Sequence, residues 1–561
     1  MKAELVLLNG KIYSIKENDE RVYGTAVAVA NGLIQKIGTD EEMAAYISDD
    51  TQVIDCHGNS ILPGLCDAHC HPSYASSTHV GCDLFGVYKE DDQSEDEVID
   101  IYMERLKDFI EANPDNELYR GTGWVSSNFQ GSRIPTRHDI DKICADKPVI
   151  LESFCQHNLW VNTKAIEIAG VGENPPEIYA GEIVKEENGY PSGWFKEPEA
   201  MDYIKLNVPG YDYTVEKYKE AILWYQKECA NKYGVTFVQD CLHSDNAKQA
   251  YKELADEGKL TLRMRGVYML EPAHFAEQLP EYIERKGTDD SGEDFRINTI
   301  KIFSEGMFVL NEPYEEKFLK DNDMPEGYKG IPYWEDEELI SSCKGAMEAG
   351  FDVHIHAMGD GSVKQSARCL AAAKKASGTD SRNVIAHLMI LDEEDSQTMA
   401  DADIIANCQP RWMVHDGDID AMYYMMGEER AKKAYPYRTF LDKGVRVAFG
   451  TDFPVTPPPD TMHEIHCCMN REVFPDVVEY EKFKGKVLGT EKKATLAEAV
   501  KSLSLNGAYQ MRGESYTGSI EEGKSAELVI LNADIEATPV SEIYAIKIDK
   551  TIFKGKVVYE A

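Results

Sequence analysis

The chain has no apolar segment long enough to cross a lipid bilayer, which takes about 20 consecutive apolar residues. Residues 1–11 also have neither the long apolar core nor the small-residue cleavage site of a signal peptide. We therefore expect neither a membrane-spanning segment nor a secretory leader.

Basic side chains are scarce. Lys and Arg total 59 against 99 Asp and Glu, which gives a net charge of −40 at pH 7. Nucleic acids and anionic membrane surfaces bind cationic patches, so this balance argues against both as partners. An excess of acidic residues is typical of proteins whose net charge keeps them soluble. The alternative interpretation is an acidic surface that steers a cationic substrate.

The cysteines do not have the pattern of a disulfide framework. There are 13, an odd number, and they are scattered through segments that we expect to be core. Such usage is typical of reduced thiols in the cytoplasm. We therefore predict a cytoplasmic protein.

Both ends of the sequence alternate in the manner of β-strands. Turn signals at Asn9-Gly10, Asn31-Gly32 and His57-Gly58 separate apolar segments within residues 1–61. Residues 515–561 have a similar alternating pattern. We predict that residues 1–61 and 515–561 pair into one small β-sandwich domain, with a separate α/β domain between them.

The middle of the chain, residues 62–514, alternates apolar runs with amphipathic helical segments. The eight runs are 62–67, Thr236–Asp240, Arg263–Met269, Thr299–Phe303, Phe351–Ala357, Val384–Met389, Ile404–Gln409 and Arg446–Gly450. The helical patterns include Asp245–Leu254, Asp336–Ala349, Ser362–Ala376 and Glu428–Leu441. Eight such strands are what a (β/α)8 TIM-like barrel requires. A doubly wound open sheet is the alternative, but no Gly-rich phosphate loop follows the first run.

Residues 73–230 do not follow this alternation. They contain Gly/Pro turns and many aromatic residues, among them Trp124, Phe129, Trp160, Trp194 and Phe195. We predict a large insertion after the first barrel strand that folds over the barrel mouth as a lid. An independent domain of unrelated purpose is the alternative.

Candidate metal ligands stand where the predicted strands end. In the segment 62–71, LPGLCDAHCH, side chains two apart share one face of a strand, so His69 and His71 can share a metal ion. Barrel active sites form at the carboxyl ends of the strands, and later strands add Lys301, His354, His356, His387 and Asp452 at those ends. Each one alone has a purely structural explanation, such as a core histidine. Their coincidence at the strand ends favours a metal site.

Lys301 is unusual in this set because an ammonium group repels metal ions. A lysine buried among apolar neighbours loses its charge readily, since desolvation lowers its pKa. The neutral amine can take up carbon dioxide and become a carbamate, an anionic oxygen ligand able to bridge two cations. A salt bridge from Lys301 to Glu305 or Asp452 is the alternative.

Several motifs recur in a known pattern. They are LPG at 62–64, D-x-H-x-H at 67–71, IKIF at 300–303, H-A-x-G-D at 356–360, AH at 386–387, QP at 409–410 and G-T-D-x-P at 450–454. Together they resemble the amidohydrolase superfamily of metal-dependent hydrolases, and more narrowly its amidohydrolase-3 branch, which includes N-substituted formamide deformylases. The resemblance spans nearly the whole chain: G-S-I-E-x-G-K-x-A at 518–526 matches the segment by which such enzymes re-enter their β-sandwich.

The insertion also carries part of the resemblance. Residues 155–162 are similar to a family stretch whose histidine, here His157, faces the substrate. Three positions depart from the pattern: Glu305 stands where Asp is frequent, Gln156 where Gly is common, and Arg411-Trp412 follows the QP motif. All three lie near the expected pocket, so they bear on the substrate rather than on the hydrolytic machinery.

The resemblance implies two divalent metal ions, for which zinc is expected. His69 and His71 would hold one ion and His356 and His387 the other, with carboxylated Lys301 between them and Asp452 alongside. Asp452 would also act as the general acid/base: it would orient a metal-bound hydroxide, accept its proton and pass it to the leaving nitrogen.

Further residues have less definite roles. His157 is a second candidate catalytic residue, as a hydrogen-bond donor to the substrate carbonyl oxygen. The candidate substrate-binding residues are Trp124, His157, Trp160, Gln409, Arg411 and Trp412, although aromatic residues are more often core. His354 either orients a ligand or packs inside the barrel. Asp360 either orients a ligand histidine or caps the helix that starts near Gly361–Ser362.

We expect a metal-dependent hydrolase that cleaves an amide-type C–N bond of a small molecule, such as an N-acyl, N-formyl or cyclic amide. A mononuclear deaminase of an N-heterocycle, which would not need Lys301, is the close alternative. A non-catalytic relative that binds ligands through its aromatic insertion is the third. A homodimer is the expected assembly for a soluble oligomer.

Overall fold

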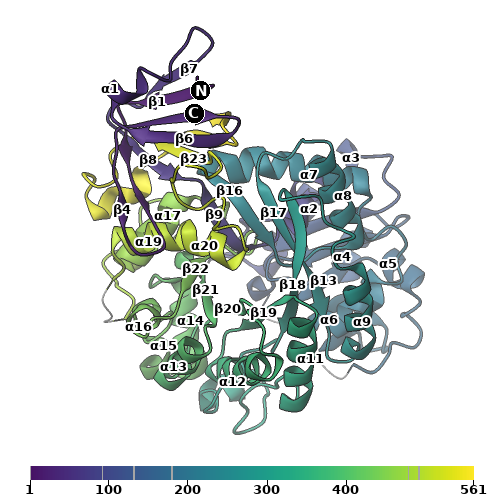
Figure 1. The fold of residues 1–561 in the computed structure, drawn as a ribbon. Coiled ribbons are helices and arrows are strands. Elements are labelled where there is room, and N and C mark those ends of the chain that lie inside the picture. The colour runs from purple at the N-terminus through teal and green to yellow at the C-terminus, as the bar shows by residue number, and fades with distance from the viewer. Residues whose placement is uncertain (1, 91, 130–132, 179–180, 478, 490–492) are drawn as a thin grey trace. The chain divides into compact units, whose positions relative to one another are not determined.

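Eight parallel strands form a nearly closed barrel, and they follow one another around it in sequence order (Figure 1). The computed structural model describes residues 2–90, 92–129, 133–178, 181–477, 479–489 and 493–561. The barrel strands are β9 (Leu65–Cys70), β16 (Val235–Asp240), β17 (Arg263–Leu270), β18 (Phe295–Phe303), β19 (Asp352–Ala357), β20 (Val384–His387), β21 (Ile405–Cys408) and β22 (Val447–Phe449). Backbone hydrogen bonds join the ends of β9 and β22, from Asp452 N to His69 O at 2.8 Å and from His71 N to Phe453 O at 2.7 Å. The predicted (β/α)8 TIM-like barrel is confirmed.

The first barrel strand begins later than predicted. Leu62 belongs to β8 (Ser60–Pro63), which pairs with β23 (Leu528–Leu531) instead of with a barrel strand. Gly64 lies between β8 and β9, where a Cβ atom would stand 2.2 Å from Thr236 Oγ1. Only glycine allows so close an approach, so the chain passes from one sheet into the barrel at this residue.

Helices follow most of the barrel strands. They include α9 (Phe275–Arg285), α11 (Asp336–Glu348), α12 (Asp360–Ser377) and α13 (Glu393–Asp401). The single helix predicted over 428–441 is wrong: the structure has α15 (Glu428–Ala431) and α16 (Tyr437–Asp442), with Tyr435 at φ 54° between them. Pro436 explains the break, because proline has no N–H and disfavours helical backbone in the residue before it.

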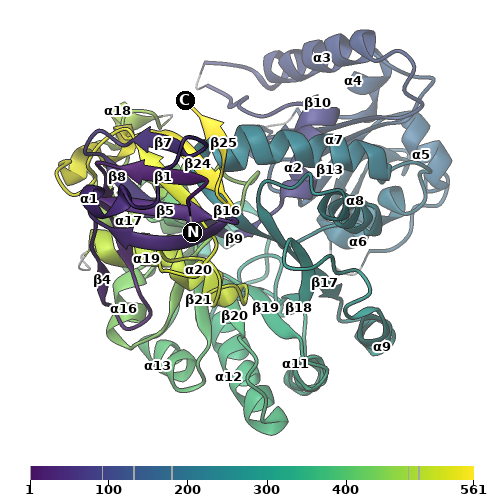
Figure 2. The same cartoon turned by 45° about the horizontal axis from the view of Figure 1, so that its top comes forward.

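The terminal segments form two small sheets that share a core. One has the order β6-β5-β1-β7 and the other β2-β8-β23-β24-β25. Their bounds are β1 (Leu5–Leu8), β2 (Lys11–Ile12), β5 (Ala26–Ala30), β6 (Leu33–Gly38), β7 (Gln52–Asp55), β24 (Ile548–Phe553) and β25 (Lys556–Glu560). Apolar side chains from both ends of the chain, among them Leu5, Val27, Ile61 and Leu528, pack together between them. Figure 2 shows the N-terminal strands in purple beside the C-terminal strands in yellow, as the predicted sandwich requires.

The chain divides into two compact units. The first comprises Met1–His71, Gln226–Leu242 and Leu254–Ala561, and so contains both the sandwich and the barrel. The second comprises Pro72–Tyr225 together with His243–Glu253. This second unit corresponds closely to the insertion expected at 73–230; its predicted place over the barrel mouth stays a prediction.

The second unit has a sheet and a core of its own. Its strand order is β10-β11-β12-β13-β15-β14. The bounds are β10 (Cys82–Asp83), β11 (Tyr119–Trp124), β12 (Val149–Ser153), β13 (Asn158–Val161), β14 (Glu182–Lys185) and β15 (Pro191–Lys196), with α3 (Glu95–Ala112) among its helices. Ser94 and Glu97 form a capping box that starts α3. Among the described residues, no helix of the chain is long and apolar enough to cross a membrane.

Candidate metal centre

Three side chains from the two strands that close the barrel converge on one point. His71 Nε2 lies 3.0 Å and His69 Nε2 lies 3.3 Å from Asp452 Oδ1, and all three residues are buried. Their ligand atoms lie within 4.8 Å of one another. His69 and His71 are two residues apart at the end of β9, so the strand directs both side chains to the same face.

Asp452 is held in an unusual backbone conformation. Its φ is 62°, in the left-handed region that L side chains rarely adopt. The carboxylate of Asp67 accepts hydrogen bonds from Thr451 N at 2.8 Å and from Thr451 Oγ1 at 2.6 Å. Two buried contacts on the preceding residue thus fix the strained turn that aims Asp452 at the histidines.

The charges of these groups suit metal binding. Burial disfavours ionised Asp452, but the hydrogen bonds from His69 and His71 outweigh it and hold its pKa well below the usual range. Burial lowers the pKa of His69 well below its ordinary value, and the nearby Lys301 ammonium adds to this effect. An ionised carboxylate and neutral imidazoles are the states in which these side chains ligate metal ions.

Lys301 is fully buried in β18, and its Nζ has no hydrogen-bond partner among the described residues. The ring of Phe303 lies 5.0 Å from this nitrogen. Burial lowers the pKa of Lys301, as the sequence predicts for an apolar surrounding. Neither Glu305 nor Asp452, the predicted alternative partners, is bonded to it within the described chain.

His356 and His387 come from the ends of the next two strands. Their ring centroids are 4.5 Å apart, and the ring of His387 is 4.7 Å from that of His69. His387 adopts φ 78°, and burial lowers its pKa to about 4. Its Nδ1 is bonded to Gln409 Oε1 at 3.0 Å. The structure therefore brings all four predicted ligand histidines to one end of the barrel.

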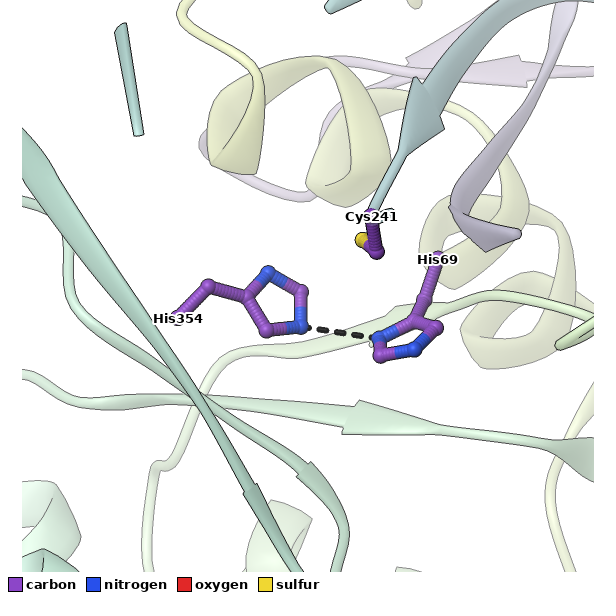
Figure 3. Close-up of side chains that lie close together, drawn as sticks. All are labelled: His69, Cys241 and His354. Atoms are coloured by element: carbon purple, nitrogen blue, oxygen red, sulfur yellow. Dashed lines mark hydrogen bonds between the residues drawn. The ribbon is translucent and has the colours of Figure 1, made fainter. Parts of the chain in front are cut away.

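A second group of potential ligands was not anticipated in full. Cys241 directly follows β16, and its sulfur and ring nitrogens of His69 and His354 lie within 4.8 Å of one another. Figure 3 shows His354 Nε2 directed at His69 Nδ1, 2.8 Å away. His354 thus contacts a predicted ligand and is also fully buried in the barrel strand β19, so both roles considered for it stay predictions. Cys241 could have been found from its position immediately after the second barrel strand.

Two carboxylates that are close in sequence to the predicted ligands bond to backbone amides. Glu305 accepts from the amides of Met358 and Gly359, at 2.5 and 3.0 Å, directly after the strand that carries His356. Burial raises the pKa of Glu305 to about 7. Asp360 accepts from the amides of Asn311 and Gly361 at the start of α12. The predicted capping role is wrong, because Asp360 is itself the first residue of α12 and the cap position is Gly359, which makes no side-chain capping bond. Within the described chain, no hydrogen bond of the Asp360 carboxylate reaches a histidine either.

The comparison with known proteins decides the family. The model of the amidohydrolase family matches residues 52–559. The chain belongs to the amidohydrolase family. It is therefore a hydrolase of the metal-dependent amidohydrolase superfamily, as the motifs predict.

Individual relatives of this amidohydrolase span its length. It is 27% identical to the putative amidohydrolase YtcJ of Bacillus subtilis, over 98% of each chain. It is 25% identical to the N-substituted formamide deformylase of Arthrobacter pascens, over 99% of this chain and 98% of the relative. An uncharacterized metal-dependent hydrolase from Pyrococcus horikoshii has the same fold, with a TM-score of 0.73 and 22% identity over 96% of this chain and 99% of that one.

One departure from the family pattern, Arg411-Trp412, lies near the predicted ligand His387. The ring of Trp412 is 5.6 Å from that of His387. Arg411 Nη1 is 2.8 Å from His463 Nδ1, and its backbone amide donates to Glu464 Oε2 at 3.1 Å. Gln409 is fully buried and bonded to His387. Trp412 is thus near the predicted ligand His387, whereas the Arg411 side chain contacts His463 and the ring of Phe474.

The remaining predicted residues belong to the second compact unit. His157 Nδ1 is 2.8 Å from Glu197 Oε2, and the preceding Gln156 adopts φ 65°, a conformation that the glycine common in the family would adopt without strain. Trp124 and Trp160 are fully buried in the core of this unit, with ring centroids 5.9 Å apart. We therefore assign these two tryptophans to packing and, of the predicted residues in this unit, keep His157 as a candidate for substrate contact.

Proposed function

We propose that this amidohydrolase cleaves an amide-type C–N bond in a small molecule, such as an N-acyl, N-formyl or cyclic amide. The observation that carries the proposal is the position of Asp452, whose carboxylate lies between His69 and His71. The formamide deformylase among its relatives makes N-substituted formamides the first compounds to test.

The residues present fit two divalent cations. His69, His71, His356 and His387 offer imidazole nitrogens, and Asp452 offers an ionised carboxylate oxygen. Lys301 Nζ is a buried amine without a partner in the described chain, and carboxylation would give it anionic oxygens. Such a nitrogen and oxygen donor set suits zinc. When bound, two cations would supply Lewis acidity towards the attacking water and the substrate carbonyl.

Asp452 performs the proton transfers in this proposal. Its carboxylate accepts a proton from the attacking water and returns it to the nitrogen of the breaking C–N bond, so the nitrogen leaves as a neutral amine. Asp67 and Thr451 hold Asp452 in place through the bonds described above. No further acid is needed, because the same group gives back the proton that it took.

His157 would donate a hydrogen bond to the substrate carbonyl as negative charge develops on its oxygen. Its Nδ1 is engaged by Glu197, which leaves Nε2 for this contact. The proposal therefore assigns substrate positioning to His157 and proton transfer to Asp452.

A mononuclear deaminase is the second candidate. It is favoured by one observation: His69, His71 and Asp452 already make a three-ligand group, whereas His356 and His387 do not complete a group of three His, Cys, Asp or Glu ligands among the described residues. Under that alternative Lys301 stays an amine.

The count of bound metal decides between the two. Purified protein supplied with zinc and isotopically labelled bicarbonate should bind about two metal ions per chain and show a carbamate resonance, which the Lys301→Met variant lacks. A metal content near one, with no carbamate signal, would establish the deaminase alternative instead.

A further inference from the structure

A continuous chain of buried hydrogen bonds connects His387 to the backbone beside His69. Gln409 Oε1 faces His387 Nδ1 at 3.0 Å, and Gln409 Nε2 donates to Asn407 Oδ1 at 2.9 Å. Asn407 Nδ2 donates to the carbonyl of Ala68 at 3.1 Å. Asn407 and Gln409 are fully buried, so no bulk water competes for these bonds.

Gln510 completes the network from outside the barrel strands. It ends α20 (Leu505–Gln510), and its Nε2 donates to the Ala68 carbonyl at 2.6 Å and to Gln239 Oε1 at 2.8 Å. Its Oε1 accepts the second hydrogen of Asn407 Nδ2 at 3.0 Å. Gln239 in turn donates to Thr299 Oγ1 at 3.2 Å, on the strand that carries Lys301.

An irregularity in the first strand makes the Ala68 carbonyl available. The pairing of β9 with β16 shifts register between Val238 and Asp240, and the strand partners Asp67 and Cys70 flank Ala68 at that shift. Its carbonyl instead accepts the two side-chain amides. The residue immediately before His69 thereby anchors the network.

The anchor dictates the direction of every amide. A backbone carbonyl only accepts, so Asn407 must turn its NH2 group to Ala68 and its oxygen to Gln409. Gln409 must then present NH2 to that oxygen and its own oxygen to His387. An oxygen facing His387 Nδ1 requires that Nδ1 carry the hydrogen, and a neutral imidazole then has a bare Nε2.

We propose that Asn407, with Gln510 behind it, is a positioning residue that sets the tautomer of His387 and so keeps its Nε2 ready to ligate a metal ion. The inference rests on the proposed role of His387 as a ligand. Within the described chain, neither side chain is hydrogen-bonded to His387. Asn407 acts by orienting Gln409, and Gln510 acts by holding Asn407.

The Asn407→Leu variant removes the acceptor that orients Gln409, whose amide can then turn its NH2 group towards His387. We expect zinc affinity, measured by chelator competition, to fall about tenfold, the lower range for partners of metal ligands. Asn383→Leu is the matched control. Asn383 is equally buried, but it bonds to Val353 N and Ser381 Oγ before β20 begins, so its loss should leave zinc affinity unchanged.

The same substitution in a Gln409→Glu protein shows whether Asn407 acts by orienting the side chain of residue 409 or by a general structural effect. In Gln409→Glu, both terminal atoms are oxygens, so an acceptor faces His387 whichever way the group turns. Adding Asn407→Leu to Gln409→Glu should cost no further affinity. An equal loss in both backgrounds, or none in the native background, would overturn the inference.

Two further measurements, the zinc affinity of His387→Ala and the tautomer of His387, distinguish the ways in which the inference can fail. If His387→Ala leaves zinc affinity unchanged, the proposed ligand role itself is wrong, which is a different failure from that of the network. A nitrogen-labelled histidine NMR spectrum of the metal-free native protein needs no substitution: the hydrogen of His387 should reside on Nδ1, and finding it on Nε2 contradicts the inference even if Asn407→Leu fails to fold.

Discussion

Asp452 is the residue on which the proposed chemistry depends. In Asp452→Asn the side chain keeps its size but no longer accepts a proton, so we expect turnover to fall by about 10²- to 10⁴-fold, the usual contribution of general acid–base catalysis. The thermal stability and the zinc content should remain near those of the native protein. Steady-state kinetics on whichever amide the native enzyme cleaves, together with elemental analysis, measure both.

Asp360→Asn is the matched control for this substitution. Asp360 also follows the end of a barrel strand, but within the described chain its carboxylate is hydrogen-bonded only to the amides of Asn311 and Gly361. Its loss should leave turnover within a few-fold of native. Full turnover in Asp452→Asn would remove that residue from the mechanism.

The buried carboxyl group of Glu464 should make the free energy of unfolding depend on pH. Burial raises its pKa from 4.5 to about 8. The unfolded chain therefore loses this proton above pH 4.5 while the folded state keeps it, so the contribution of Glu464 lowers the free energy of unfolding progressively up to about pH 8. Below pH 4.5 both states are protonated and the contribution vanishes.

Glu464→Gln removes this titration and keeps an oxygen to accept from Arg411 N. Relative to native protein, the variant should gain stability as pH rises from 5 to 8, by on the order of a few kcal/mol. Urea unfolding at the two pH values measures the difference. A difference that does not change with pH would show that Glu464 ionises normally in the folded state.

At this scale the sequence predicts residue types better than their partners. The spacing of His69 and His71 indicates their shared face, and the apolar neighbours of Lys301 indicate its burial. Trp124 and Trp160 mislead because a large aromatic side chain suits a core and a pocket equally. Asn407 and Gln510 leave no pattern in the sequence, since their roles come from contacts between distant segments.

Among the structural elements, the junction between β9 and β22, where the barrel closes, positions Asp452 beside His69 and His71. Thr451→Val keeps the shape of the side chain but deletes the bond from Thr451 Oγ1 to Asp67. We expect a loss of about 1 kcal/mol in stability and a clear fall in turnover, because the turn that aims Asp452 is less firmly held. Urea unfolding and kinetics on the same preparation measure the two effects.

Thr551→Val in β24 makes the same chemical change away from the site. Thr551 is buried and donates to the carbonyl of Asn231 at 2.6 Å. The Thr551→Val variant should lose about as much stability as Thr451→Val, but its turnover should stay at the native level. Equal turnover losses in both valine variants would mean that the junction between β9 and β22 does not position Asp452.

The elements themselves were predictable where hydrophobic pattern alone decides them. The barrel strands coincide with the apolar runs because both faces of such strands are buried. The helix expected over 428–441 failed at a single residue, Pro436, whose ring overrides the amphipathic pattern around it. The start of β9 was misplaced because residues 60–63 are as apolar as a barrel strand but pair with β23.

For the whole molecule, metal removal should lower stability. A ligand that binds only the folded state adds about 2.7 kcal/mol when its free concentration is 100 times its dissociation constant. Chelation should therefore lower the melting temperature, and added zinc should restore it. A melting temperature that is the same with and without zinc would argue that the folded protein does not bind the ion.

The overall architecture was predictable because both ends alternate as strands while the middle alternates strands with helices. The placement of the second unit follows from no local pattern, so its role as a lid stays a prediction. The homodimer and the cytoplasmic location also stay predictions. Light scattering of the purified protein tests the dimer.

The most direct test of the central claim is product identification. Zinc-loaded native protein is incubated with N-substituted formamides, other N-acyl amines and cyclic amides, and the products are separated by mass spectrometry. We predict hydrolysis, with one carboxylic acid and one amine formed for each bond cleaved, or the ring-opened amino acid from a cyclic amide. Ammonia released from an N-heterocycle, with every amide left intact, would contradict the proposed function.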